Sequence, residues 1–92
     1  MRVIYKQTIP IRDAVPVFMP RGSEIIHAGE QRGQLCIWYK CDDTRPDVQR
    51  TIHIAGTGHD LGHLDQSSAY YFTTVQMSNG LVWHLFLGRE DV

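Results

Sequence analysis

The chain has few cysteines and no long apolar run, and both shortages narrow the class of protein. Only Cys36 and Cys41 are present. If both lie in one regular strand, their spacing places them on opposite faces, beyond the ~7 Å between Cα atoms that a disulfide tolerates. No apolar run approaches the ~20 residues that span a bilayer. We therefore expect free thiols, no membrane association and a location in a reducing cytoplasm.

The chain also lacks an excess of charge of either sign. Nine basic and ten acidic side chains leave a formal charge of −1, and the arginines are scattered along the sequence. Proteins that bind duplex nucleic acid usually carry a basic face, so the composition predicts no duplex partner. With 92 residues, 42% of them hydrophobic, the chain has the size of a single β-rich domain over residues 1–92.

Helical periodicity is missing too, whereas strand patterns recur along the chain. Seven segments have strand composition: residues 2–9, 15–19, 24–29, 34–41, 50–55, 69–76 and 81–87. Glycine turns at 31–33 and 77–80 predict two hairpins, and prolines confine the second segment to a sheet edge. Residues 59–68 leave room for one short helical turn. The sequence predicts an all-β, mainly antiparallel fold, a small sandwich or barrel-like sheet of six to seven short strands.

The last segment is apolar on both of its faces. Trp83 and Leu85 share one face, while Val82 and Phe86 lie on the other. One small sheet does not bury two apolar faces, so either two sheets of the chain pack together or a second copy covers the exposed face. We expect a homo-oligomer, and two sheets of one chain remain the alternative.

A candidate ligand site follows the strand pattern at residues 50–55. Gly56, Thr57, Gly58, His59 and Asp60 form a glycine-spaced loop with hydroxyl, imidazole and carboxylate groups. Consecutive N–H groups in such a loop can converge on an anion, so a phosphate-bearing small molecule is one hypothesis. The Gly-Lys-Ser/Thr ending of a Walker loop is absent, and a simple turn explains the glycines equally well.

Metal and thiol chemistry have weaker support. His59, Asp60, His63 and Asp65 form the densest group of possible ligands, and His53 could approach from the preceding strand. Such a group would suit zinc or manganese in a hydrolase built on His59, Asp60 and His63. Gly62 interrupts the helical spacing that such a set would need. Cysteines in strands usually act as small hydrophobic residues, so a thiol enzyme is also poorly supported. We expect no cofactor and favour a protein that is not an enzyme.

Aromatic side chains are abundant for so short a chain. Trp38, Tyr70, Tyr71, Phe72 and Trp83 are candidate interaction residues, because exposed rings often anchor protein interfaces. Neighbouring rings in a strand point to opposite faces, so the run 70–72 should expose at least one ring. For the two tryptophans we favour a position in which they face each other in the core.

Four segments of the chain stand in the same order as in a known family. They are residues 19–26 (MPRGSEII), 34–39 (QLCIWY), 50–59 (RTIHIAGTGH) and 81–86 (LVWHLF). With its Gly-Thr-Gly-His and Trp-His motifs, the chain resembles a family of small uncharacterised proteins encoded by bacteriophages and prophages. The resemblance covers nearly the whole chain and implies an accessory protein that acts in the host cytoplasm.

The expected function is that of a non-enzymatic binding module that inhibits or modulates a host or defence protein. Abundant aromatic residues, strands that are apolar on both faces and the resemblance to phage proteins support this hypothesis. The first alternative is a protein that binds or sequesters a nucleotide or another phosphate ligand. The second is the metal-dependent hydrolase.

Overall fold

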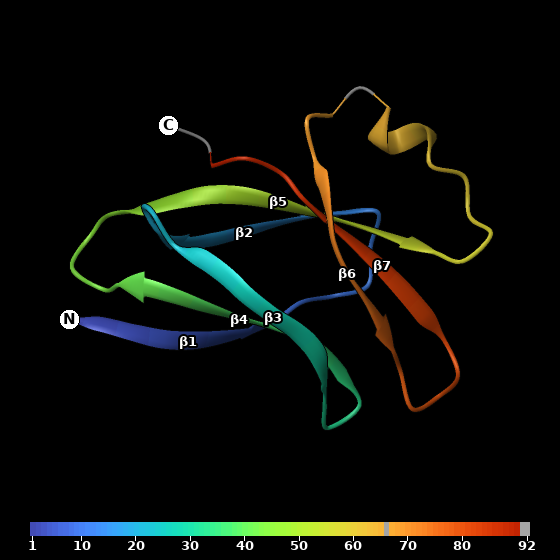
Figure 1. Cartoon of the computed structure of the whole chain (residues 1–92), viewed down its shortest axis with the longest axis horizontal. Coiled ribbons are helices and arrows are strands. Elements are labelled where there is room, and N and C mark those ends of the chain that lie inside the picture. Colours follow the sequence, from blue (N-terminus) through green and yellow to red (C-terminus); the bar gives the residue numbers. More distant parts are fainter. Residues whose placement is uncertain (66, 91–92) are drawn as a thin grey trace.

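The computed structural model describes residues 1–65 and 67–90, and it is built from β-strands (Figure 1). The strands are β1 (Arg2–Thr8), β2 (Ala14–Pro20), β3 (Glu24–Gln31), β4 (Gln34–Asp42), β5 (Asp47–Gly56), β6 (Tyr70–Gln76) and β7 (Val82–Leu87). One 3-10 turn, η1 (Gly62–Leu64), lies in the stretch predicted to hold a helical turn. Within the described ranges no helix has the length and apolar character needed to cross a membrane. The all-β prediction is confirmed.

The strands form two antiparallel sheets. One sheet has the order β1-β4-β3 and the other the order β2-β5-β7-β6. Both predicted hairpins form, joining β3 to β4 and β6 to β7, and positive φ angles at Gly33 (78°) and Gly80 (89°) explain why glycine is needed there. Strand β2 lies at a sheet edge, because its prolines cannot donate ladder hydrogen bonds.

The two sheets pack face to face around a shared hydrophobic core. Met19, Leu35, Ile37, Ile52 and Leu85 are its largest fully buried aliphatic side chains, and they come from both sheets. Burying each such side chain contributes about 1.5–3 kcal/mol. The apolar inner faces of β4 and β7 are thus covered within one chain, as in the alternative of two packed sheets. A homo-oligomer stays a prediction.

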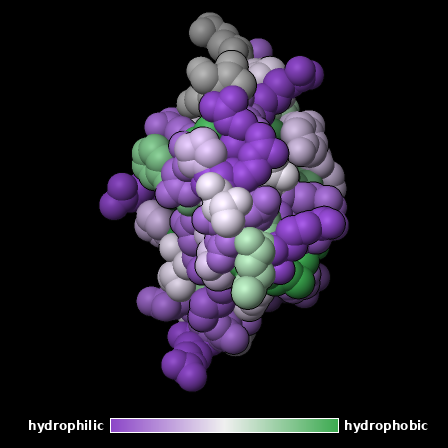
Figure 2. Space-filling view, turned by 90° about the vertical axis from the view of Figure 1, so that its left-hand side faces the viewer, coloured by the Kyte–Doolittle hydropathy of each residue, from purple (hydrophilic) through white to green (hydrophobic). Residues whose placement is uncertain are grey.

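Strand β5 connects two chemically different ends of the sandwich. At its start lie Met1, the β2–β3 turn and the β4–β5 turn, on the left of Figure 1, whereas its last residue leads into segment 57–65 on the right. Figure 2 faces the first end, whose surface is largely hydrophilic. The candidate glycine loop lies at the second end.

Candidate functional site

The predicted glycine loop is a tight turn that ends β5. The His59 N–H donates to the Gly56 carbonyl oxygen at 3.0 Å, which closes a four-residue turn. Gly58 has φ +84°, a left-handed conformation that side chains other than glycine rarely adopt. Part of the glycine signal in the sequence therefore reports turn geometry.

The other glycine makes room for an imidazole ring. The Gly56 N–H donates to His59 Nδ1 at 3.3 Å, so the ring folds back over the backbone. A Cβ at position 56 would lie only 2.7 Å from His59 Cε1. The ring also meets Trp83 edge to face, with centroids 6.1 Å apart and an angle of 67° between the planes. Glycine at 56 is thus required for this position of His59.

Thr57 begins a chain of hydrogen bonds that crosses the outer face of the four-stranded sheet. Its hydroxyl lies 2.9 Å from His84 Nε2, and His84 Nδ1 lies 2.9 Å from the Thr74 hydroxyl. Thr74 in turn hydrogen-bonds with the Tyr71 hydroxyl at 2.8 Å. Hydroxyls both donate and accept, so either neutral tautomer of His84 fits this chain. Each imidazole nitrogen has a partner.

A bulge in β6 brings these groups together. The register between β6 and β7 shifts between Tyr71 and Thr73, which sets Tyr71 opposite Phe86 and Thr74 opposite His84. The extra residue, Phe72, packs against the core. Bulges re-aim side chains in this way and are common beside functional sites.

Above the hydrogen-bonded chain lies a surface depression of about 310 Å³, which we call the aromatic hollow. Its apolar lining includes Leu61, Tyr71 and Phe86, and Thr57 and His84 supply its polar groups. The Tyr71 and Phe86 rings meet edge to face at 5.7 Å. Leu61 and Tyr71 are 46% and 55% exposed, so both remain accessible to a ligand or partner. The hollow suits an apolar or aromatic group with one polar atom.

Several polar groups that the phosphate hypothesis would use are already engaged within this loop. The Thr57 hydroxyl is engaged with His84, and the backbone N–H groups of Gly56 and His59 are engaged within the turn. Among the described residues that line the aromatic hollow, none is lysine or arginine. Asp60, predicted as a ligand residue, instead accepts a hydrogen bond from the Gly62 N–H at 2.8 Å and stabilises the next turn.

The proposed metal ligands lie apart. His59 packs against Trp83, whereas His63 faces His53 with ring centroids 6.3 Å apart. Trp83 and His53 point to opposite faces of their sheet. His53 pairs with Phe86, and Phe86 and Trp83 lie on opposite faces of β7. Within residues 1–65 and 67–90, no three His, Cys, Asp or Glu side chains gather as a metal site. A hydrolase built on His59, Asp60 and His63 therefore has no preformed ligand set.

His53 stands out for an unsatisfied atom. Its Nδ1 is buried and has no hydrogen-bond partner in the described part of the chain. Burial and, secondarily, the nearby charge of His63 lower the pKa of His53 below its usual value. The ring is therefore kept neutral at neutral pH.

The predicted interaction residues divide into exposed and covered rings. Tyr71 projects beside the aromatic hollow, and Tyr70 is exposed at the edge strand β6, where its hydroxyl accepts a hydrogen bond from Arg50 at 3.4 Å. Phe72 and Trp83 pack against the core. The expectation that Trp38 faces Trp83 in the core is wrong. Trp38 lies on the outer face of the three-stranded sheet beside His27, at a centroid distance of 5.4 Å.

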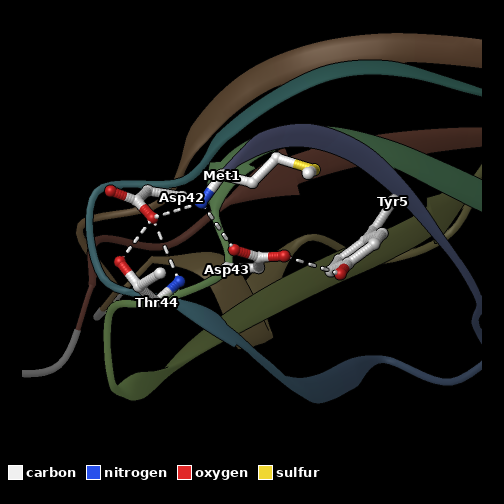
Figure 3. Close-up of polar contacts among 5 residues, drawn as sticks. All are labelled: Met1, Tyr5, Asp42, Asp43 and Thr44. Atoms are coloured by element: carbon white, nitrogen blue, oxygen red, sulfur yellow. Dashed lines mark hydrogen bonds and ion pairs between the residues drawn. The ribbon is translucent and has the colours of Figure 1, made fainter.

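A second polar cluster lies at the opposite end of the sandwich (Figure 3). The Met1 amino group lies 2.9 Å from Asp43 and 3.6 Å from Asp42. The hydrogen bond to Asp43 raises the pKa of this amino group, and hydrogen bonds from Thr44 lower the pKa of Asp42. Tyr5 also donates to Asp43 at 3.4 Å. These contacts fasten the start of β1 to the β4–β5 turn.

Sequence reasoning missed Leu61, Thr74, His84 and Phe86 as site residues. The available signal was the alternation in β7, which places His84 and Phe86 on the same face. Thr74 joined that face only through the bulge in β6, which no sequence pattern indicated. Apart from Leu61, which follows the glycine motif directly, the missed side chains come from β6 and β7 and lie far from that motif in sequence.

Together, the two packed sheets and the hollow at the end of β5 define a small antiparallel β-sandwich with a surface pocket of aromatic and hydroxyl groups. Over residues 1–92 the chain matches the family described as Domain of unknown function (DUF7352), and it belongs to that family. No curated protein and no solved structure matches the chain. The resemblance to phage proteins stays a prediction.

Proposed function

We propose that the protein is a non-enzymatic binding module encoded by a bacteriophage or prophage. It acts in the host cytoplasm by occupying a surface of a host or defence protein. The observation that carries this proposal is the aromatic hollow, where Leu61 and Tyr71 are exposed beside Phe86. Exposed aromatic and aliphatic anchors around a depression are typical of the centre of a protein interface.

The series of hydrogen bonds from Thr57 through His84 and Thr74 favours a binding role over a catalytic one. In nucleophile–histidine pairs, a third group usually carries a negative charge that stabilises the imidazolium as it forms. Here the partner of His84 Nδ1 is the neutral hydroxyl of Thr74. The arrangement is poorly suited to activating Thr57 as a nucleophile, but it fixes the side chains that surround the hollow.

A pull-down from bacterial lysate tests the proposal. The wild-type protein should enrich a defined partner, and the double variant Leu61→Ser/Tyr71→Ser should lose it, because truncating central anchors removes much of the binding energy. Phe18→Ser is the matched control, since Phe18 is 57% exposed but lies on the edge strand β2. Absence of any enriched protein, or equal loss in the control, contradicts the proposal.

The same hollow supports a second candidate, a protein that binds a small planar molecule. Its volume of about 310 Å³ lies at the lower end of the range for small-molecule sites. A flat ring would pack against Tyr71 or Phe86 and hydrogen-bond with Thr57. A panel of nucleosides and aromatic metabolites should then contain a compound that raises Tm, since a ligand that binds only the native state stabilises it. The shift should vanish in Tyr71→Ser and persist in Tyr5→Ser, and a panel without any hit contradicts this candidate.

A further inference from the structure

Four basic side chains that are far apart in sequence converge at the end of the sandwich opposite the glycine loop. Arg2, Arg21, Lys40 and Arg45 line one depression of about 330 Å³, which we call the basic hollow. The sequence suggested scattered arginines, yet the fold brings these four together. Figure 2 faces this end of the molecule, where hydrophilic residues dominate the surface.

Two turns form the frame of the basic hollow. The Arg21 N–H donates to the Pro46 carbonyl oxygen at 2.8 Å, which ties the β2–β3 turn to the β4–β5 turn. Gly22 has φ +82°, and a Cβ there would lie 3.8 Å from Arg45 Nη1. The Arg45 guanidinium therefore lies next to the backbone of the β2–β3 turn. Lys40 and Arg2 complete the hollow from the neighbouring strands β4 and β1.

The charges that line the basic hollow are not balanced. Glu24 and Asp42 are the two carboxylates that line the hollow, against four cations. Glu24 pairs with Lys40 at 3.5 Å. Asp42 is engaged by the Met1 amino group and by Thr44, although Arg2 is its neighbour across the ladder.

Three guanidiniums of the hollow have no paired carboxylate among the described residues. Arg2, Arg21 and Arg45 form no ion pair with any residue of the described ranges. Three further carboxylates lie at this end: Asp43 pairs with the Met1 amino group, Asp47 lies opposite Pro20 across the ladder, and Glu90 accepts a hydrogen bond from the Gly22 N–H at 2.6 Å. Cations held together in this way repel one another, and a bound anion relieves that repulsion.

We propose that the basic hollow is an anion-binding site for a ligand with adjacent phosphate-type oxyanion groups, such as a diphosphate. Guanidiniums bind phosphate through paired, charge-assisted hydrogen bonds, and three of them around one depression match the several oxygens of a diphosphate. This site is separate from the aromatic hollow, which lacks lysine and arginine among its described lining residues. Phosphate recognition thus belongs to the start of β5 and not to the glycine turn at its end.

Isothermal titration calorimetry of the full chain with inorganic pyrophosphate at low salt tests the proposal. The wild-type protein should bind with a Kd below about 1 mM. The double variant Arg21→Gln/Arg45→Gln should bind at least about tenfold more weakly, since each removed guanidinium takes charge-assisted hydrogen bonds with it. All four side chains of the hollow contact solvent, so these variants should fold, and a thermal melt checks this.

Two controls separate the site from general charge effects and from the proposed partner surface. Arg12→Gln removes one exposed arginine outside the hollow and should leave the pyrophosphate affinity unchanged. Tyr71→Ser should also leave it unchanged, so this test fails or succeeds independently of the pull-down. No binding at about 10 mM pyrophosphate, or equal weakening in Arg12→Gln, overturns the proposal.

A further arm identifies the source of the diphosphate. A nucleoside diphosphate that binds as tightly as pyrophosphate shows that the anion alone is recognised. Tighter binding of the nucleoside diphosphate assigns the ligand to the nucleotides. Both results support the site. A nucleoside diphosphate that fails to compete with pyrophosphate contradicts the proposal, because the two ligands share the groups that the arginines would bind.

Discussion

The two ends of β5 satisfy their polar groups in opposite ways. Around Gly56, hydroxyl, imidazole and backbone groups hydrogen-bond with one another, and apolar rings remain exposed above them. At the start of β5, by contrast, carboxylates pair with the Met1 amino group and Lys40, while three arginines form no ion pair within residues 1–65 and 67–90. The end at Gly56 therefore exposes mainly apolar surface, whereas the end where β5 begins exposes charge.

A conspicuous sequence motif therefore does not mark the part of the surface where charged groups lack partners. The glycines at 56 and 58 serve the turn and the His59 ring. The unpaired charges come from residues at positions 2, 21 and 45, which no local pattern connects. The two ends can be perturbed separately, and both depend on the shared hydrophobic core.

Replacing Leu85 by Ala should have the largest effect. Leu85 is 0% exposed and its removal leaves a cavity between the sheets, which costs about 2–5 kcal/mol of unfolding free energy. We expect Tm to fall by more than about 10 °C in a thermal melt. Leu81→Ala is the control, because Leu81 is 50% exposed and should change Tm little. Similar shifts for both variants would contradict the assigned core.

Gly56→Ala should disturb only the end of the sandwich that carries the aromatic hollow. The new Cβ displaces the His59 ring, and overpacking of this kind costs about 1–3 kcal/mol. The cost should shrink when His59→Ala is added, because the clash then disappears. A double-mutant cycle by denaturant unfolding measures this coupling. Additive effects would contradict the clash between position 56 and His59, and a change in pyrophosphate affinity would show that the two ends are not independent.

Lowering the pH should destabilise the protein, because the folded state disfavours the protonation of His53. Its folded pKa is lowered, so between the unfolded value near 6.5 and that lower pKa the unfolded chain binds more protons. Stability is therefore full above pH 6.5 and falls as the pH drops through this window. His53→Phe should flatten the profile of Tm against pH, with His27→Phe as the control. An unchanged slope in His53→Phe would rule out this assignment.

Of these changes, Asp43→Asn should have the smallest effect on Tm, and it should affect only the end of the sandwich where β5 begins. It removes the main cause of the raised Met1 pKa. The amino group contributes stability below its ordinary pKa of 8.0, and this is lost as the pH rises through the raised value. Exposed ion pairs contribute little, so we expect Tm to fall by less than about 4 °C at neutral pH. A larger loss, or one that persists at high pH, would contradict this account.

The strands could be predicted from the residue pattern within each segment. Alternation, proline and glycine placed every strand, and the main discrepancy is β5, which begins at Asp47 and not at Arg50. The turn between β4 and β5 is short, and Asp42 stabilises it by accepting a hydrogen bond from the Thr44 N–H at 3.0 Å. Hydrogen bonds of this kind depend on side-chain position and have only a weak sequence signature.

The candidate sites were less predictable, because they depend on strand order. The sequence identified Gly56, Thr57, Gly58, His59 and Tyr71, but their partners His84 and Thr74 became neighbours only through the pairing of β5, β7 and β6. The basic hollow was invisible for the same reason. Its arginines are scattered along the chain, and only the packing of two turns brings them together.

The most direct test of the account is an NMR titration that maps where a phosphate ligand binds. Amide resonances of the 15N-labelled protein are followed while inorganic pyrophosphate is added. The account predicts shifts concentrated at residues 21–24 and 40–45, with the amides of residues 56–60 unmoved. Shifts concentrated at 56–60 would return phosphate recognition to the glycine turn and contradict the division between the two ends of β5.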